Sequence, residues 1–152
     1  MTSKVISTTS FGLDTVNVSL LRSDDGSSWK TQPLVITPRW ETSLTFLCSF
    51  LKSNRKWVDE MILQYGAVLC RGFEVTSACD FEQAVMSYQP ELSSTYRGTS
   101  PRAAIPGTKK VFSAAEVPTN YPIAQHCEMS FLPAPPRQLY FGCLKESETT
   151  GG

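Results

Sequence analysis

Apolar residues between Thr42 and Tyr65 recur at helical spacing, and this pattern constrains the fold of the chain more than any other feature. Residues three or four positions apart share one face of a helix, so the pattern predicts helices with one buried face. Its members are Leu44, Leu47, Leu51, Trp57, Val58, Met61, Ile62 and Tyr65. Ser53-Asn54 divides the pattern into two helices, and Gly66 is placed to end the second. The apolar run from Ala67 to Arg71 follows at once and predicts a buried strand.

The chain before these helices is polar and rich in Ser and Thr. We therefore expect residues 1–32 to form an N-terminal extension and residues 33–152 to form the folded region. Within the extension, Val16 to Leu21 predicts one short strand. Pro33 to Pro38 predicts a second strand, which leads into a turn.

A third helix is predicted beyond the apolar strand. Ser77 or Asp80 is a suitable N-terminal cap for a helix that runs through Tyr88. Its expected inward residues are Phe81, Ala84, Val85 and Tyr88. Residues 89 to 110 contain Pro and Gly at short intervals, which is typical of loops. Strand signals then return at Val111-Phe112, at Ile123 to Glu128 and at Gln138 to Leu144.

Composition excludes several classes of protein. With 152 residues, 41% of them hydrophobic, the chain is long enough to bury the core of one domain. It has 14 basic and 14 acidic residues and no basic stripe, so we expect no nucleic-acid partner. No apolar run approaches the roughly 18 residues of a transmembrane helix, so we expect no membrane partner.

The cysteines favour a reducing compartment. Their number, five, is odd, and their wide spacing contains no CxxC pair, which argues against a disulfide framework and a structural zinc site. We therefore expect a cytoplasmic protein. An organelle transit peptide stays open as an alternative, because the first ten residues contain no acid.

His126-Cys127-Glu128 is the strongest functional signal, and His126 is the only histidine of the chain. In an extended segment, residues two apart point to the same face, so His126 and Glu128 would point the same way and Cys127 would point away. Two histidines and one carboxylate form a common iron(II) site. The tripeptide alone is more simply explained by a lone histidine that is hydrogen-bonded at a strand end beside a solvated Glu.

The residues around this tripeptide make the signal specific. Pro122 to Phe131, followed by Pro135 to Phe141, resembles the metal-binding core of the taurine dioxygenase superfamily, and its clavaminate synthase-like branch most closely. Tyr65 to Phe73 and Tyr96 to Arg102 resemble two earlier motifs of that superfamily, in the same order. The resemblance spans about residues 33–152.

This resemblance implies a fold and a chemistry. Members are iron(II)- and 2-oxoglutarate-dependent oxygenases, so the implied class is an α+β partial double-stranded β-helix, or jelly roll, with N-terminal flanking helices. Residues 33–152 would be the N-terminal part of such a domain. The implied metal ligands are His126 and Glu128, with Fe(II) as cofactor and 2-oxoglutarate as cosubstrate. The implied partners are dioxygen and a small-molecule substrate, which would undergo hydroxylation or related C–H oxidation.

Arg102 and Gln125 are candidates for contacts with the substrate or with the metal ligands, although each is equally well explained as a surface side chain. Family members continue past a Gly-Gly pair with further cosubstrate-binding residues and a second histidine. The present sequence ends at Gly151-Gly152, so we expect weak or no activity from it alone. Two alternatives remain: a non-catalytic remnant that acts as a binding protein, and an unrelated domain in which His126 is structural.

Overall fold

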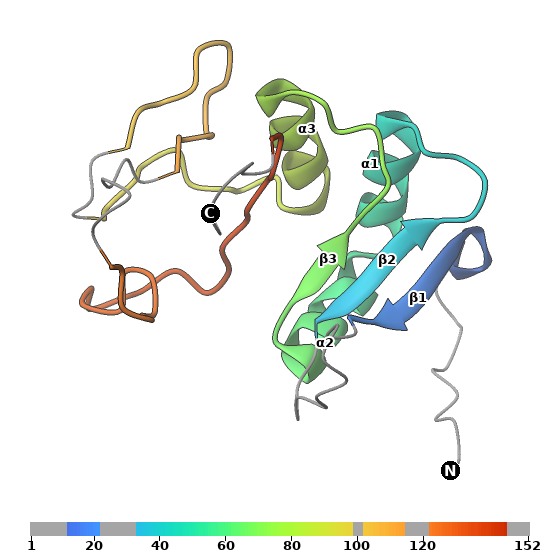
Figure 1. Cartoon of the computed structure of the whole chain (residues 1–152), viewed down its shortest axis with the longest axis horizontal. Coiled ribbons are helices and arrows are strands. Elements are labelled where there is room, and N and C mark those ends of the chain that lie inside the picture. Colours follow the sequence, from blue (N-terminus) through green and yellow to red (C-terminus); the bar gives the residue numbers. More distant parts are fainter. Residues whose placement is uncertain (1–11, 22–32, 99–101, 115–121, 146–152) are drawn as a thin grey trace. The chain divides into compact units, whose positions relative to one another are not determined.

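The computed structural model describes residues 12–21, 33–98, 102–114 and 122–145. The chain divides into two compact units, Met1–Glu74 and Val75–Gly152. The described residues form a mixed α/β structure with three helices and one three-stranded sheet (Figure 1).

The first unit contains the sheet, whose strand order is β1-β2-β3. The central strand β2 (Leu34–Pro38) pairs antiparallel with β1 (Val16–Leu20) and parallel with β3 (Val68–Cys70). All three strands confirm the sequence-based expectations. The residues of β3 are half-buried rather than buried, because β3 has only one neighbouring strand among the described residues.

Strand β1 lies within the polar extension that we expected for residues 1–32. It pairs with β2 from Val16 opposite Pro38 to Leu20 opposite Leu34. The side chain of Val16 is fully buried, with a relative exposure of 1%. This part of the extension therefore belongs to the sheet, while the division of the chain at residue 33 stays a prediction.

The two helices that the apolar spacing predicted are present: α1 (Leu44–Ser53), which packs against α2, and α2 (Arg55–Tyr65), which packs against β2 and β3. Ser43 caps α1 by accepting a hydrogen bond from the backbone N–H of Phe46 at 3.2 Å. Asn54 separates the helices, is buried, and donates its side-chain N–H to the carbonyl of Phe50 at 2.9 Å. Gly66 ends α2 with φ of +78°, a conformation that glycine adopts without steric cost.

The second unit contains α3 (Ala78–Tyr88), which begins at the expected cap. Ser77 and Asp80 form a reciprocal capping box, and the hydrogen bonds from Ser77 and Thr76 hold the pKa of Asp80 below its usual value. Of the four residues expected to face inward, Phe81 is half-buried. The other three, Ala84, Val85 and Tyr88, are buried.

The rest of the second unit departs from the prediction. Residues 122–145 contain no helix or strand, so the strands predicted at Ile123 to Glu128 and Gln138 to Leu144 are wrong. Where a strand was predicted at Val111-Phe112, the structure has one isolated β-bridge, between Ala104 and Phe112. An extended segment needs a hydrogen-bonded neighbour to form a strand, and no other described segment pairs with residues 122–145.

None of the described helices is both long enough and apolar enough to cross a membrane.

Candidate metal site

A tight turn directs the carboxylate of Glu128 toward His126. The backbone N–H of Ser130 donates to the carbonyl of Cys127 at 3.2 Å, so Glu128 and Met129 are the central residues of this turn. Met129 has φ of +55°, in the left-handed region that side chains other than glycine rarely adopt. Such strain of the backbone is found preferentially at functional sites.

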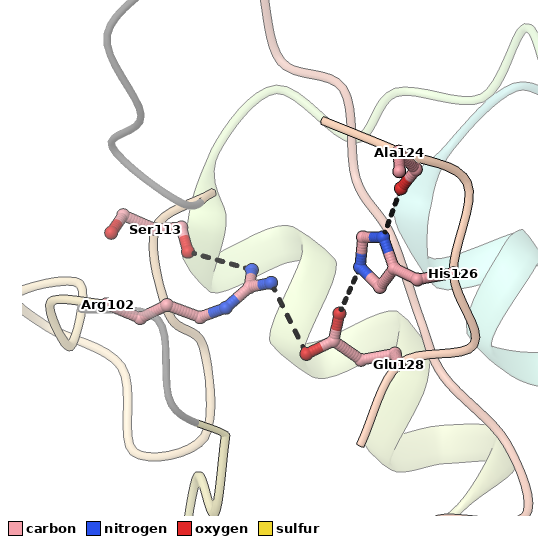
Figure 2. A network of polar contacts seen from close by, with 5 residues as sticks. All are labelled: Arg102, Ser113, Ala124, His126 and Glu128. Carbon is pink, nitrogen blue, oxygen red and sulfur yellow. Dashed lines mark hydrogen bonds and ion pairs between the residues drawn. The ribbon is translucent and has the colours of Figure 1, made fainter. Parts of the chain in front are cut away.

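The imidazole of His126 and the carboxylate of Glu128 face each other (Figure 2). The distance from His126 Nε2 to Glu128 Oε2 is 3.4 Å. The relative exposures of the two side chains are 58% and 21%. A solute can therefore reach the imidazole, whereas the carboxylate is mostly covered.

The second ring nitrogen of His126 fixes which nitrogen carries the proton. Nδ1 lies 2.8 Å from the carbonyl oxygen of Ala124. A carbonyl oxygen can only accept, so Nδ1 must donate, and in neutral His126 the lone pair on Nε2 faces the carboxylate. Two electron-rich atoms repel each other unless a cation lies between them. The hydrogen bond to Ala124 and then the contact with Glu128 accordingly raise the pKa of His126.

Arg102 approaches the other side of the carboxylate. Its Nη2 lies 3.7 Å from Glu128 Oε1, and its Nη1 donates to the carbonyl of Ser113 at 3.4 Å (Figure 2). The guanidinium carbon lies 5.1 Å from the centre of the Tyr96 ring. Arg102 Nε is buried and has no hydrogen-bond partner among the described residues.

The structure brings together three of the four expected site residues. His126 and Glu128 meet as expected, but through a turn rather than through the alternation of a strand. Arg102 joins them, whereas Gln125 is exposed and lies outside this network of contacts. Whether Arg102 or Gln125 contacts a substrate stays a prediction.

Sequence reasoning missed the carbonyl of Ala124, the carbonyl of Ser113 and the ring of Tyr96. A backbone carbonyl leaves no mark in the residue types, so the sequence contains no signal for the first two. Tyr96 lies in the same motif as Arg102, and that proximity was the available signal. Among the described residues, no group of three or more His, Cys, Asp and Glu side chains is placed to hold a metal ion.

These features define a mixed α/β protein with an imidazole and a carboxylate that converge in one loop. The sequence matches the family described as taurine catabolism dioxygenase TauD, TfdA family, over residues 30–152. This match covers most of the chain, and the protein belongs to the TauD/TfdA family. The match also agrees with the motifs at Tyr65 to Phe73, Tyr96 to Arg102 and Pro122 to Phe141.

A clavaminate synthase-like protein of Arabidopsis thaliana is similar to the chain. The two are 32% identical over 128 residues, which is 80% of this chain and 38% of the Arabidopsis protein. The chain thus spans well under half the length of the curated relative that it matches. The expected branch of the superfamily is therefore confirmed.

Proposed function

We propose that this chain forms part of an iron(II)- and 2-oxoglutarate-dependent oxygenase, in which His126 and Glu128 supply two of the iron ligands. The observation that carries the proposal is the 3.4 Å approach of His126 Nε2 to Glu128 Oε2, with Nδ1 held by Ala124. Metal-binding histidines characteristically donate their second ring N–H to a carbonyl or carboxylate. His126 therefore has the hydrogen bond and the free lone pair of such a ligand.

The donor set suits a ferrous ion. Neighbouring ligand atoms about 2.1 Å from an octahedral ion lie about 3 Å apart, so only a small movement would bring the two atoms onto one cation. Imidazole nitrogen and carboxylate oxygen are the donor types of non-haem iron(II) oxygenases. When bound, iron and 2-oxoglutarate supply the activation of dioxygen for oxidation of a substrate C–H bond.

The side chains of the chain would have simpler tasks. Glu128 offsets the charge of the cation, and the hydrogen bond from His126 Nδ1 to Ala124 orients the ring and leaves the lone pair of the neutral imidazole on Nε2. One molecule of this chain has a single imidazole, so it contains one of the two histidines of a two-histidine, one-carboxylate site. We therefore propose weak or absent turnover by the 152-residue polypeptide alone.

The proposal also covers the fold, the domain boundary and the cellular location of the protein. Family membership supports a partial double-stranded β-helix for the oxygenase domain, and the match from residue 30 supports a boundary near residue 33. The five cysteines of the chain are free thiols, which supports a cytoplasmic location.

Anaerobic calorimetric titration with Fe(II) tests the proposal. The unmodified chain is expected to bind one Fe(II) weakly, because it supplies two protein ligands, and both His126→Ala and Glu128→Ala are expected to abolish measurable binding. Cys127→Ala is the matched control, because Cys127 lies between the two ligands yet is exposed and outside their contacts. Binding that survives either ligand variant, or that depends on Cys127, would contradict the assignment.

One observation favours a second candidate, a non-catalytic protein that binds a partner. Residues 122–145 expose five large apolar side chains: Ile123, Phe131, Leu139, Phe141 and Leu144. Contiguous exposed apolar surface commonly marks an interaction site. A monomer in light scattering that binds no Fe(II) at His126 would favour this candidate over the oxygenase.

A further inference from the structure

We infer that Arg102 is a positioning residue, which holds the Glu128 carboxylate so that one oxygen is reserved for the cation bound by His126. The inference rests on the proposed function, because it assigns a cation to the space between His126 and Glu128. The inference also predicts that the contact between His126 and Glu128 depends on Arg102 in the metal-free chain. The inference and the proposed function can therefore fail separately.

The two oxygens of Glu128 have different partners. Oε1 lies 3.7 Å from Arg102 Nη2, and Oε2 lies 3.4 Å from His126 Nε2 (Figure 2). A free carboxylate can rotate and present either oxygen, or both together, to a cation. An arginine beside Oε1 opposes that rotation and favours coordination through Oε2 alone.

Arg102 can act in this way because its own guanidinium is held in place. Nη1 donates to the carbonyl of Ser113 at 3.4 Å, and the planar group lies 5.1 Å from the centre of the Tyr96 ring. Its side chain is only 20% exposed, so solvent screens the contact with Glu128 less than it screens a surface ion pair. An arginine held by stacking and by a hydrogen bond loses little additional freedom when it meets a carboxylate.

Tyr96 is itself held beneath Arg102. Its ring lies 5.9 Å from the ring of Phe112, centre to centre. It also covers Gly98 so closely that a Cβ at that position would clash with the Tyr96 hydroxyl oxygen and ring. A side chain at residue 98 would therefore displace the ring on which Arg102 rests.

The segment that carries Arg102 is fixed as a hairpin. The backbones of Ala103 and Ser113 are joined by a 2.8 Å hydrogen bond, and the N–H of Ala103 donates to Ser113 Oγ at 3.0 Å. Glu82 on α3 accepts the backbone N–H groups of Lys109 and Lys110 at 2.7 and 2.6 Å. Hydrogen bonds thus connect the hairpin that carries Arg102 to α3.

The sign of the effect on metal affinity separates positioning from simple electrostatics. A guanidinium beside the site repels a divalent cation, so loss of its charge alone would tighten Fe(II) binding. Loss of the orientation of Glu128 would weaken binding, and removal of a residue that orients a metal ligand typically costs about 10- to 100-fold in affinity. We expect the second effect to be larger.

Two variants test the inference: Arg102→Gln removes the charge, and Arg102→Lys keeps it without the planar group. Arg137→Gln is the matched control, because Arg137 is exposed and its replacement changes the net charge by the same amount. Anaerobic titration with Fe(II) is expected to show about 10-fold or greater weakening for Arg102→Gln. Arg102→Lys should weaken binding less, and Arg137→Gln should bind like the unmodified chain.

A second readout needs no metal. The nuclear Overhauser effect between the ring protons of His126 and the Glu128 side chain should be present in the unmodified metal-free chain. It should be lost in Arg102→Gln and weakened in Gly98→Ala, whose added Cβ displaces Tyr96. Circular dichroism confirms that each variant keeps its helices.

The outcomes are distinct. Unchanged or tighter Fe(II) binding by Arg102→Gln would overturn the positioning role, and so would a Glu128 contact that persists in that variant. An unmodified chain that shows this contact but binds no Fe(II) would overturn both the proposed function and the assignment of the reserved oxygen to a cation.

Discussion

The sheet of the first unit and the site of the second unit are built by opposite means. In the first unit, Leu34, Val35 and Ile36 of β2 are all buried, and backbone ladders on both sides fix their register. In residues 122–145, the described chain contains neither helix nor strand, and exposed apolar side chains replace a core. The comparison teaches that the buried core of the sheet lies in one region, whereas the proposed metal ligands lie in a segment that has no buried apolar side chain.

The largest expected effect tests where stability resides. Ile36 is fully buried at the centre of the sheet, so Ile36→Ala should lower the free energy of unfolding by about 2–5 kcal/mol. Urea denaturation followed by tryptophan fluorescence measures the change. Leu63→Ala and Phe141→Ala are the controls, because these side chains are 87% and 80% exposed. Equal losses in all three variants would contradict the contrast between buried and exposed regions.

Thiol reactivity provides a second test of the same contrast. Cys70 is half-buried as a residue, but desolvation of its thiol raises the pKa to about 11, so the reactive thiolate at pH 8 should be about 100-fold scarcer than that of an unperturbed thiol. Cys79, Cys127 and Cys143 of the second unit are exposed. Iodoacetamide labelling followed by peptide mass spectrometry should modify these three long before Cys70. The urea-unfolded chain should show similar rates at all sites, and early labelling of folded Cys70 would refute the desolvation assigned to its thiol.

A smaller effect concerns the start of α3. Ser77→Ala removes one half of the capping box and should destabilise this helix by about 1 kcal/mol. Amide hydrogen exchange along residues 78–88 reports the loss locally. Ser87→Ala is the control in the same helix, because the Ser87 hydroxyl only donates back to the carbonyl of Ala84. Identical exchange in the two variants would show that the cap contributes nothing.

The smallest effect is the pH dependence of the site. The folded-state pKa of His126 is raised, first by the Ala124 carbonyl and then by Glu128, so its midpoint should lie above the ordinary value of 6.5. The stability that the protonated ring contributes is therefore fully present below the ordinary pKa, and it is lost as pH rises through the folded-state pKa. A proton on Nε2 competes with a metal, so Fe(II) affinity should increase over that same rise in pH.

Nuclear magnetic resonance titration of the single imidazole checks this shift. Glu128→Gln should lower the midpoint only in part, because the carbonyl of Ala124 makes the larger contribution. A midpoint at or below 6.5 in the unmodified chain would contradict the geometry around His126.

The two regions also differ in how well the sequence predicts them. The helices and β1 to β3 were predicted because their signals are local: apolar spacing, the Ser77 cap and Gly66. The strand predicted at Ile123 to Glu128 was wrong, since a strand depends on neighbouring strands that are often distant in the sequence.

At the site, the pairing of His126 with Glu128 was predicted, but its cause was not. The left-handed conformation of Met129, which shapes the turn, has no signature in a methionine. The approach of Arg102 to Glu128 joins two separate segments through the stacking on Tyr96 and the Ser113 carbonyl. Residue types alone specify neither contact.

The most direct test of the central claim is the response of the single histidine signal to Fe(II) under argon. If His126 Nε2 and Glu128 hold the ion together, titration with excess Fe(II) should shift and broaden that signal in the unmodified chain at concentrations that leave it unchanged in Glu128→Ala. A signal that does not change when Fe(II) is added, or that changes equally in both proteins, would show that the imidazole and the carboxylate do not form a metal site.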